Sequence, residues 1–137
     1  MNDRKVIDTD SCIEVLVYDL DKILEGMDKQ SSLMSRGQLD ISSTDLVDGI
    51  DTSFEYDHYH RILVIAQNNN YYVCLGQIED NSKAMIDDAV RYEQLKFTVQ
   101  KTSILDNHIR SIQLKNLRLY LVDAEYSLVV FTIGVTE

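Results

Sequence analysis

The chain has 137 residues and carries 23 acidic against 13 basic side chains, a net charge of −10 with histidine neutral. Phosphate backbones and anionic lipid repel such a chain, so the charge disfavours direct binding to nucleic acid or to a membrane and favours a protein partner, in particular a basic one. Hydrophobic residues make up 45% of the chain, which excludes disorder as a description of the whole. We therefore expect a single domain over residues 1–137, able to bury roughly two-thirds of its unfolded surface.

Residues 1–10 form a polar lead-in without the apolar segment of a signal peptide, and no apolar run approaches the ~18 residues of a membrane span. Cys12 and Cys74 are the only cysteines, and they form no Cys-x-x-Cys motif. Both lie in apolar segments, which favours a reducing compartment. We expect a cytoplasmic protein.

The first predicted element is a helix over residues 11–27. Ser11 and Glu14 match a capping box, in which each side chain bonds the backbone N–H of the other residue. Apolar residues then recur at helical spacing, at Ile13, Leu16, Val17, Leu20, Ile23, Leu24 and Met27. The following residues, 28–52, are rich in Ser, Asp and Gly, and we predict a long polar connection there.

A β-hairpin is predicted at the centre of the chain, with a turn at Asn68–Asn70 between two apolar runs. The continuous apolar run over residues 62–66 indicates burial on both faces and therefore a central strand. A preceding strand is expected to begin near residue 53, because large side chains alternate with charged ones there.

A second helix is predicted to begin at Asn81 or Ser82, with Met85, Ile86, Ala89 and Val90 in register. Strict alternation over residues 95–101 and 117–121 predicts half-buried strands, and residues 128–135 form a last, very apolar strand after a turn at residues 123–126. The pattern over residues 102–116 fits either a helix or a strand.

The predicted fold is α+β: a mainly antiparallel sheet of about five strands with two helices packed on it, in the order α-β-β-α-β-β-β. The same order occurs in small adaptor folds of the roadblock type and approximates that of acidic secretion chaperones. These similarities concern fold alone, because fold does not determine function.

Asp19 and Asp21 follow an apolar run, and the pattern resembles the first motif of haloacid-dehalogenase-like phosphatases. The resemblance implies that Asp19 attacks phosphorus, that Asp21 acts as the general acid, and that Mg²⁺ binds beside them. On the predicted helix, however, the two side chains are about 200° apart and do not share one metal ion.

His58 and His60 would project from one face of a strand, at a spacing that suits two metal ligands. Zinc needs at least one further ligand, and the remaining histidine, His108, lies in the ambiguous segment. Cys74 is predicted to be buried and inert, because an apolar setting raises the pKa of a thiol. We expect no metal and no cofactor.

Tyrosine is enriched at protein interfaces, where its ring supplies contact area and its hydroxyl group supplies specificity. The interface candidates are Tyr56, Tyr59, Tyr71, Tyr72 and Tyr126. Tyr71 and Tyr72 point to opposite faces of their strand, so at most one of them is expected in the core.

The predicted function is that of an acidic protein–protein interaction module without catalytic activity, such as an adaptor, chaperone, immunity protein or antitoxin. The last strand is a candidate edge for pairing with a partner or for homodimerisation. One alternative is a metal-dependent phosphate-ester hydrolase using Asp19 and Asp21. Another is an inhibitor that mimics nucleic acid with a continuous acidic face.

Overall fold

The structure is a computed structural model that describes residues 12–40, 44, 46, 52–79 and 92–134. Strands account for 65% of these residues and helical turns for 7%, and no helix reaches seven residues. The prediction of an α+β fold with two helices packed on a sheet is therefore wrong for the described chain, which is mostly β. The second predicted helix, residues 81–90, lies outside the described residues.

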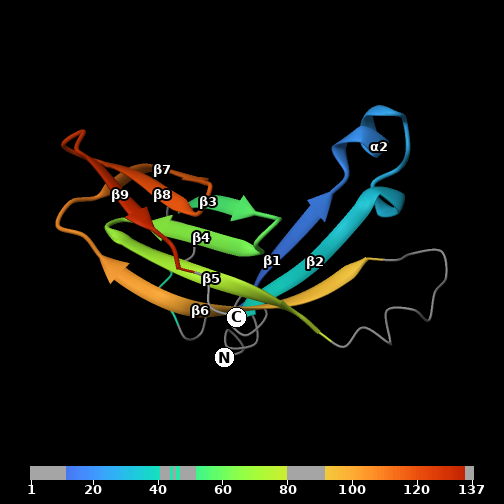
Figure 1. Cartoon of the computed structure of the whole chain (residues 1–137), viewed down its shortest axis with the longest axis horizontal. Coiled ribbons are helices and arrows are strands. Elements are labelled where there is room, and N and C mark those ends of the chain that lie inside the picture. The colour runs from blue at the N-terminus through green and yellow to red at the C-terminus, as the bar shows by residue number, and fades with distance from the viewer. Residues whose placement is uncertain (1–11, 41–43, 45, 47–51, 80–91, 135–137) are drawn as a thin grey trace, which may run out of the picture. The chain divides into compact units, whose positions relative to one another are not determined.

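The described strands form two sheets, with the orders β1-β2-β6-β5-β4-β3 and β7-β8-β9 (Figure 1). The larger sheet contains β1 (Cys12–Tyr18), β2 (Leu33–Asp40), β3 (Thr52–Asp57), β4 (Ile62–Gln67), β5 (Asn70–Ile78) and β6 (Glu93–Ile104). The smaller sheet contains β7 (Ile109–Lys115), β8 (Arg118–Asp123) and β9 (Leu128–Thr132). The helical pieces are α2 (Leu20–Leu24) and η1 (Gln30–Ser32).

The chain divides into two compact units. The first comprises residues 1–45 and 76–98, and the second comprises residues 46–75 and 99–137.

In the first unit, the predicted helix over residues 11–27 is wrong, because its first half is strand β1. Ile13, Val15 and Val17 alternate along this segment, and β-branched side chains favour a strand over a helix. The helix is reduced to the five residues of α2, whose N-cap is Asp19. No side chain of α2 is buried, so its apolar residues do not form the expected core stripe.

The predicted polar connection over residues 28–52 contains strand β2, which pairs antiparallel with β1 and parallel with β6. Ser35, Gly37 and Leu39 form its buried face, and Leu39 is 1% exposed. Serine and glycine are typical of loops in a sequence. Gly37 is required here because the ring of Phe97 on β6 occupies the space where a side chain at this position would lie.

In the second unit, the predicted hairpin is confirmed. β4 and β5 are antiparallel, and Gln67 pairs with Asn70, which leaves a two-residue turn at Asn68 and Asn69. All six residues of β4 are buried, as the continuous apolar run predicted. The preceding strand is also confirmed as β3, which pairs antiparallel with β4.

The three strands β7, β8 and β9 pack one face of their sheet against β4 and β5. Leu119 and Leu121 of β8 are 0% exposed and join a cluster that includes Val64, Tyr71 and Val73. The ambiguous segment over residues 102–116 is therefore strand: β6 continues to Ile104, and β7 follows after a short connection.

The turn of the central hairpin holds this connection between the two sheets. The Asn69 carbonyl group accepts a hydrogen bond from Leu105 N, and the Asn69 side-chain amide donates to Leu105 O, each at 2.8 Å. Asn68 O accepts a further bond from Ile109 N at 2.7 Å. The turn residues therefore do more than reverse the chain, because they anchor the entry to β7.

Candidate functional site

The strand β9 lies at an edge of the smaller sheet and exposes apolar side chains. Val129 and Phe131 face the core, whereas Leu128, Val130 and Thr132 face outward. Leu128 is 62% exposed and Val130 is 46% exposed. This strand is the candidate functional site.

The backbone of β9 offers hydrogen-bonding groups on its free side. Ile133 N donates to Leu117 O at 2.8 Å, and Asp123 N donates to Ser127 O at 3.1 Å, on the side that faces β8. An antiparallel ladder alternates residues that bond the neighbour with residues that point away from it. The N–H and C=O groups of Leu128, Val130 and Thr132 therefore point away from β8, where none has a partner within the described residues.

The opposite edge of the same sheet, β7, is occupied at one position. Leu114, next to the C-terminal end of β7, donates its backbone N–H to the carboxylate of Glu55 on β3, at 3.0 Å. Proteins commonly protect sheet edges with an inward-pointing charge, a lysine, a proline or a bulge. The sequence of β9 itself, Leu-Val-Val-Phe-Thr, contains no charge and no proline, although Lys101 Nζ of β6 lies 5.8 Å from the ring centroid of Phe131.

The outer face of the smaller sheet continues the apolar character of the edge. Tyr120 lies opposite Val130 and Val122 lies opposite Leu128 in the β8–β9 register. A shallow hollow of about 520 Å³ beside them is lined by Glu55, Ser111, Gln113, Tyr120, Val122 and Leu128. The charged residues of β7 and β8 that share this face are basic, at Lys115 and Arg118.

The turn that precedes β9 is held by Asp123. Its Oδ1 atom accepts backbone hydrogen bonds from Glu125 and Ser127, both at 2.9 Å, and its Oδ2 atom accepts one from the Asn107 side chain at 3.3 Å. The bond from Ser127 lowers the pKa of the Asp123 carboxyl most, and those from Asn107 and Glu125 lower it further. The ionised carboxylate therefore fixes the start of the edge strand.

Comparison with protein-family models, with curated proteins and with solved structures finds no match for this chain. No relative contributes a site residue or an activity. The candidate site accordingly depends on the geometry of the described residues alone.

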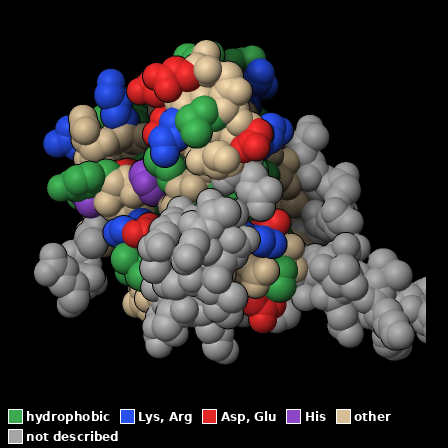
Figure 2. All heavy atoms as spheres, turned by 90° about the vertical axis from the view of Figure 1, so that its right-hand side faces the viewer, with side chains coloured by type: hydrophobic (Ala, Val, Ile, Leu, Met, Phe, Trp, Pro, Cys, Tyr) green, Lys and Arg blue, Asp and Glu red, His purple; other side chains and the backbone are tan. Residues whose placement is uncertain are grey.

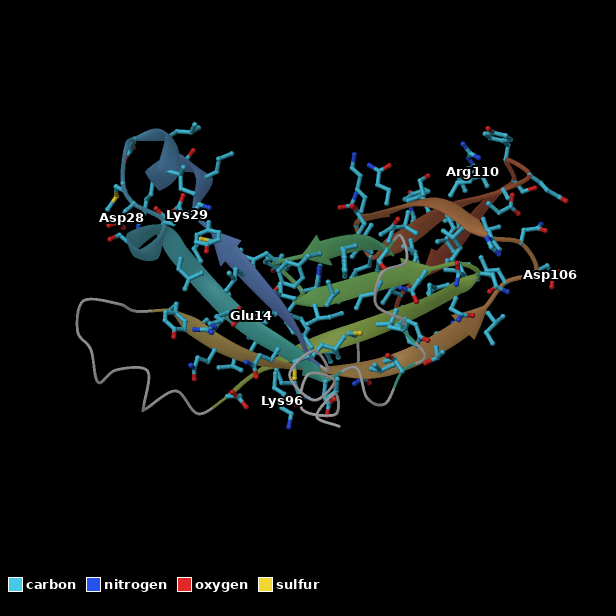
Figure 3. The ribbon with its side chains drawn as sticks, turned by 180° about the vertical axis from the view of Figure 1, so that it is seen from behind. Glu14, Asp28, Lys29, Lys96, Asp106 and Arg110 are labelled. Carbon is cyan, nitrogen blue, oxygen red and sulfur yellow. The ribbon has the colours of Figure 1, made fainter. Side chains whose placement is uncertain are left out.

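The predicted interface tyrosines occupy three different settings. Tyr126 is 72% exposed in the turn before β9, where the Arg110 guanidinium lies 4.5 Å from its ring centroid (Figure 3 labels Arg110). Tyr59 is exposed at the β3–β4 turn, and Tyr56 is half-buried on β3. Tyr126 is thus the exposed tyrosine among these candidates that adjoins the edge strand.

The prediction that at most one of Tyr71 and Tyr72 belongs to the core is wrong. Their side chains are 1% and 2% exposed, because β5 is covered on both faces. The ring of Tyr71 packs against that of Phe131 on β9, with the two ring centroids 5.6 Å apart. Neither tyrosine presents a surface for a partner in this structure.

The histidine pair lies in the β3–β4 turn and not on a strand, so the predicted one-face arrangement is wrong. His60 Nδ1 instead contacts Asp57 Oδ2 at 2.9 Å. Burial raises the pKa of Asp57, but hydrogen bonds from the His60 ring and backbone outweigh it, and the pKa is lowered. No group of three potential metal ligands is found in the parts of the chain that the structure describes.

Asp19 follows strand β1 directly, contrary to the predicted helix. Its Oδ1 atom accepts hydrogen bonds from the backbone of Asp21 at 3.0 Å and of Lys22 at 3.4 Å, so its carboxylate acts as a helix cap. Cys12 is exposed. Burial raises the pKa of the Cys74 thiol to about 12, which agrees with its predicted inertness. No described helix is long and apolar enough to span a membrane.

The sequence indicated the last strand as an edge, but it did not single out which of its residues offer free backbone groups. That choice follows from the register with β8. Glu55, which occupies one position of the competing edge, carried no signal in the sequence because its contact to Leu114 spans 59 positions.

Proposed function

We propose that this chain is a non-catalytic protein–protein interaction module that adds a partner's strand to the open edge of β9. The observation that carries the proposal is the set of outward backbone groups at Leu128, Val130 and Thr132. In strand addition, main-chain hydrogen bonds supply affinity and alternate side chains supply specificity. The exposed Leu128 and Val130 side chains are suited to that second role.

The net charge of the chain adds a long-range component. With 23 acidic and 13 basic residues, the chain attracts a basic partner and steers its approach. Steering acts on the association rate, while the apolar contacts at β9 hold the complex. A foreign partner of this kind should therefore associate more slowly as the salt concentration rises.

The experiment is an affinity capture with three baits: the wild type, Val130→Lys and Leu24→Lys. Leu24 is a matched control because it is an exposed leucine on α2, far along the chain from β9. The proposal predicts a protein that binds the wild type and Leu24→Lys but is lost with Val130→Lys. Equal binding by all three baits would contradict a docking role for β9.

The phosphate-ester hydrolase remains a prediction from the sequence. It requires Mg²⁺-dependent turnover of phosphate esters that Asp19→Asn abolishes. The nucleic-acid mimic requires a continuous acidic face, and Figure 2 shows acidic and basic side chains interspersed on the face that it presents. No observation on the described residues favours either function over strand addition, so neither is proposed.

A further inference from the structure

We infer that, when no foreign partner is bound, the strand added to β9 is β9 of a second copy of this chain, antiparallel to the first, with a two-fold axis at Val130. This inference rests on the proposed function, because it uses the same edge. It goes further by naming the occupant and the register.

The register follows from which residues point outward. Leu128, Val130 and Thr132 each present one N–H and one C=O group away from β8. If two such edges meet antiparallel about Val130, Leu128 lies opposite Thr132 of the other copy and Val130 lies opposite itself. Opposed residues of this type exchange both of their hydrogen bonds. All the outward groups on both edges are then satisfied at once.

The side chains are compatible with this register. The outward side chains of β9 are two apolar residues and one threonine, so no charged residue of one strand faces a charge on the other. Val130 meets a second Val130, and Leu128 meets the threonine methyl group. Cross-strand pairs between β-branched and aliphatic side chains stabilise antiparallel sheets.

Within the described residues, β9 is the less obstructed of the two edges of the smaller sheet. Glu55 occupies the outward N–H of Leu114 on β7, so a second strand added there would displace a carboxylate. A symmetric dimer needs a surface that is complementary to itself, and an uncharged strand with evenly spaced outward groups meets that requirement. The edge of β9 therefore suits a copy of itself without any change in the fold.

The decisive experiment places opposite charges on the axis. Sedimentation equilibrium over a roughly hundredfold concentration range should show the wild type and Leu24→Lys as dimers at the upper end. Val130→Lys and Val130→Glu should each be monomeric, because two like charges would meet at the axis. An equimolar mixture of Val130→Lys and Val130→Glu should recover a heterodimer, since lysine then faces glutamate.

Unchanged thermal unfolding of the two charged variants, compared with Val130→Thr, checks that each remains folded. Recovery of the dimer in the mixture supports the inference, because a misfolded variant or an unspecific apolar contact would not show charge complementation. Dimers of Val130→Lys alone, or a mixture that stays monomeric, would overturn it. So would equal weakening by Leu24→Lys.

Cross-linking gives an independent measure of the register. In a Cys12→Ser background, Val130→Cys should form an intermolecular disulfide, because opposed residues of a hydrogen-bonded pair lie about 5.5 Å apart at Cα, within the range for such bonds. Gln113→Cys in the same background is the control, since β7 lies two strands from β9. Equal cross-linking at both positions would contradict an axis at Val130.

The failure of this inference differs from the failure of the proposed function. A wild type that stays monomeric over the whole range overturns the second copy as the occupant. The proposed function is judged separately, by whether Val130→Lys loses a captured partner that Leu24→Lys retains.

Discussion

Phe97 lies between two glycines on neighbouring strands of the larger sheet. A Cβ atom on Gly76 of β5 would lie 2.7 Å from Cε1 of the ring, and one on Gly37 of β2 would collide with Cε2. The ring itself is 2% exposed. These two glycines are therefore needed for the space that they leave rather than for their backbone freedom.

We expect Gly37→Ala to lower the free energy of unfolding by about 1–3 kcal/mol, because the added methyl group overpacks a buried site. In a Phe97→Leu background, which removes the ring atoms it would strike, the same change should cost less. Urea unfolding of the four chains of this double-mutant cycle measures the coupling. An identical cost in both backgrounds would show that the ring does not set the requirement for glycine.

Asp123 makes the stability of the β9 turn dependent on pH. Its hydrogen bonds lower its pKa in the folded chain, so they stabilise the fold above the ordinary carboxyl pKa of about 3.9. That stability is lost as the pH falls through the lowered pKa. Unfolding measured from neutral to acid pH should therefore show a weaker acid dependence in Asp123→Asn than in the wild type.

The donors around Asp123 provide a graded comparison. Asn107→Ala removes the side-chain donor but leaves the two backbone donors in place. Its acid dependence should lie between those of the wild type and Asp123→Asn. Identical acid profiles for all three chains would contradict a role for this carboxylate in pH stability.

At the scale of the element, the backbone N–H groups of β9 point alternately toward β8 and away from it. Substitution by proline can distinguish these two kinds of position. The N–H of Val129 is directed at β8, whereas that of Val130 is directed away from it. Val129→Pro should cost about 1–3 kcal/mol, because it removes a bond of the ladder and leaves the acceptor on β8 without its donor. Val130→Pro should cost clearly less, because proline is tolerated where its missing N–H would face solvent.

Both proline variants should be measured at a concentration low enough for the wild type to be monomeric, so that association does not contribute. Chemical denaturation gives the two free energies directly. A Val130→Pro variant as unstable as Val129→Pro would mean that the assigned outward direction of the Val130 N–H is wrong.

At the scale of the whole molecule, the net charge of −10 opposes self-association and assists a basic partner. Salt screens both effects, since the Debye length falls to about 8 Å at physiological ionic strength. The dimer through β9 should therefore tighten severalfold between low and high salt. A complex with a basic protein should weaken over the same range.

Sedimentation at two salt concentrations measures the first effect, and titration of a captured basic partner measures the second. The two salt effects have opposite signs because the β9 strands at the dimer axis are uncharged. The repulsion between two copies therefore comes from the charges on the rest of each chain, and salt weakens it. Dimerisation that weakens with salt would indicate that charge pairs hold the copies together, against the uncharged axis inferred here.

The sequence by itself determined those elements whose signals are local. The turn chemistry of Asn68–Asn70 predicted the central hairpin, strict alternation predicted the strands that became β6 and β8, and a very apolar run predicted β9. These patterns are reliable because each depends on neighbours a few residues away. The last strand was also expected to be an edge, which the strand order confirms within the described residues.

The tertiary structure alone decided the rest, because the deciding contacts join residues far apart in the chain. Residues 11–27 fit a helical spacing, yet β1 forms because β2 pairs with it. The sequence did not predict strand β2, because its Gly37 is typical of a loop. Gly37 is needed in the strand because it leaves room for the ring of Phe97, sixty positions away. In the same way, Glu55 occupies the outward N–H of Leu114 on β7, whereas the outward groups of β9 have no partner among the described residues. A local pattern holds no information about such partners, whereas the fold decides which backbone groups remain available for binding.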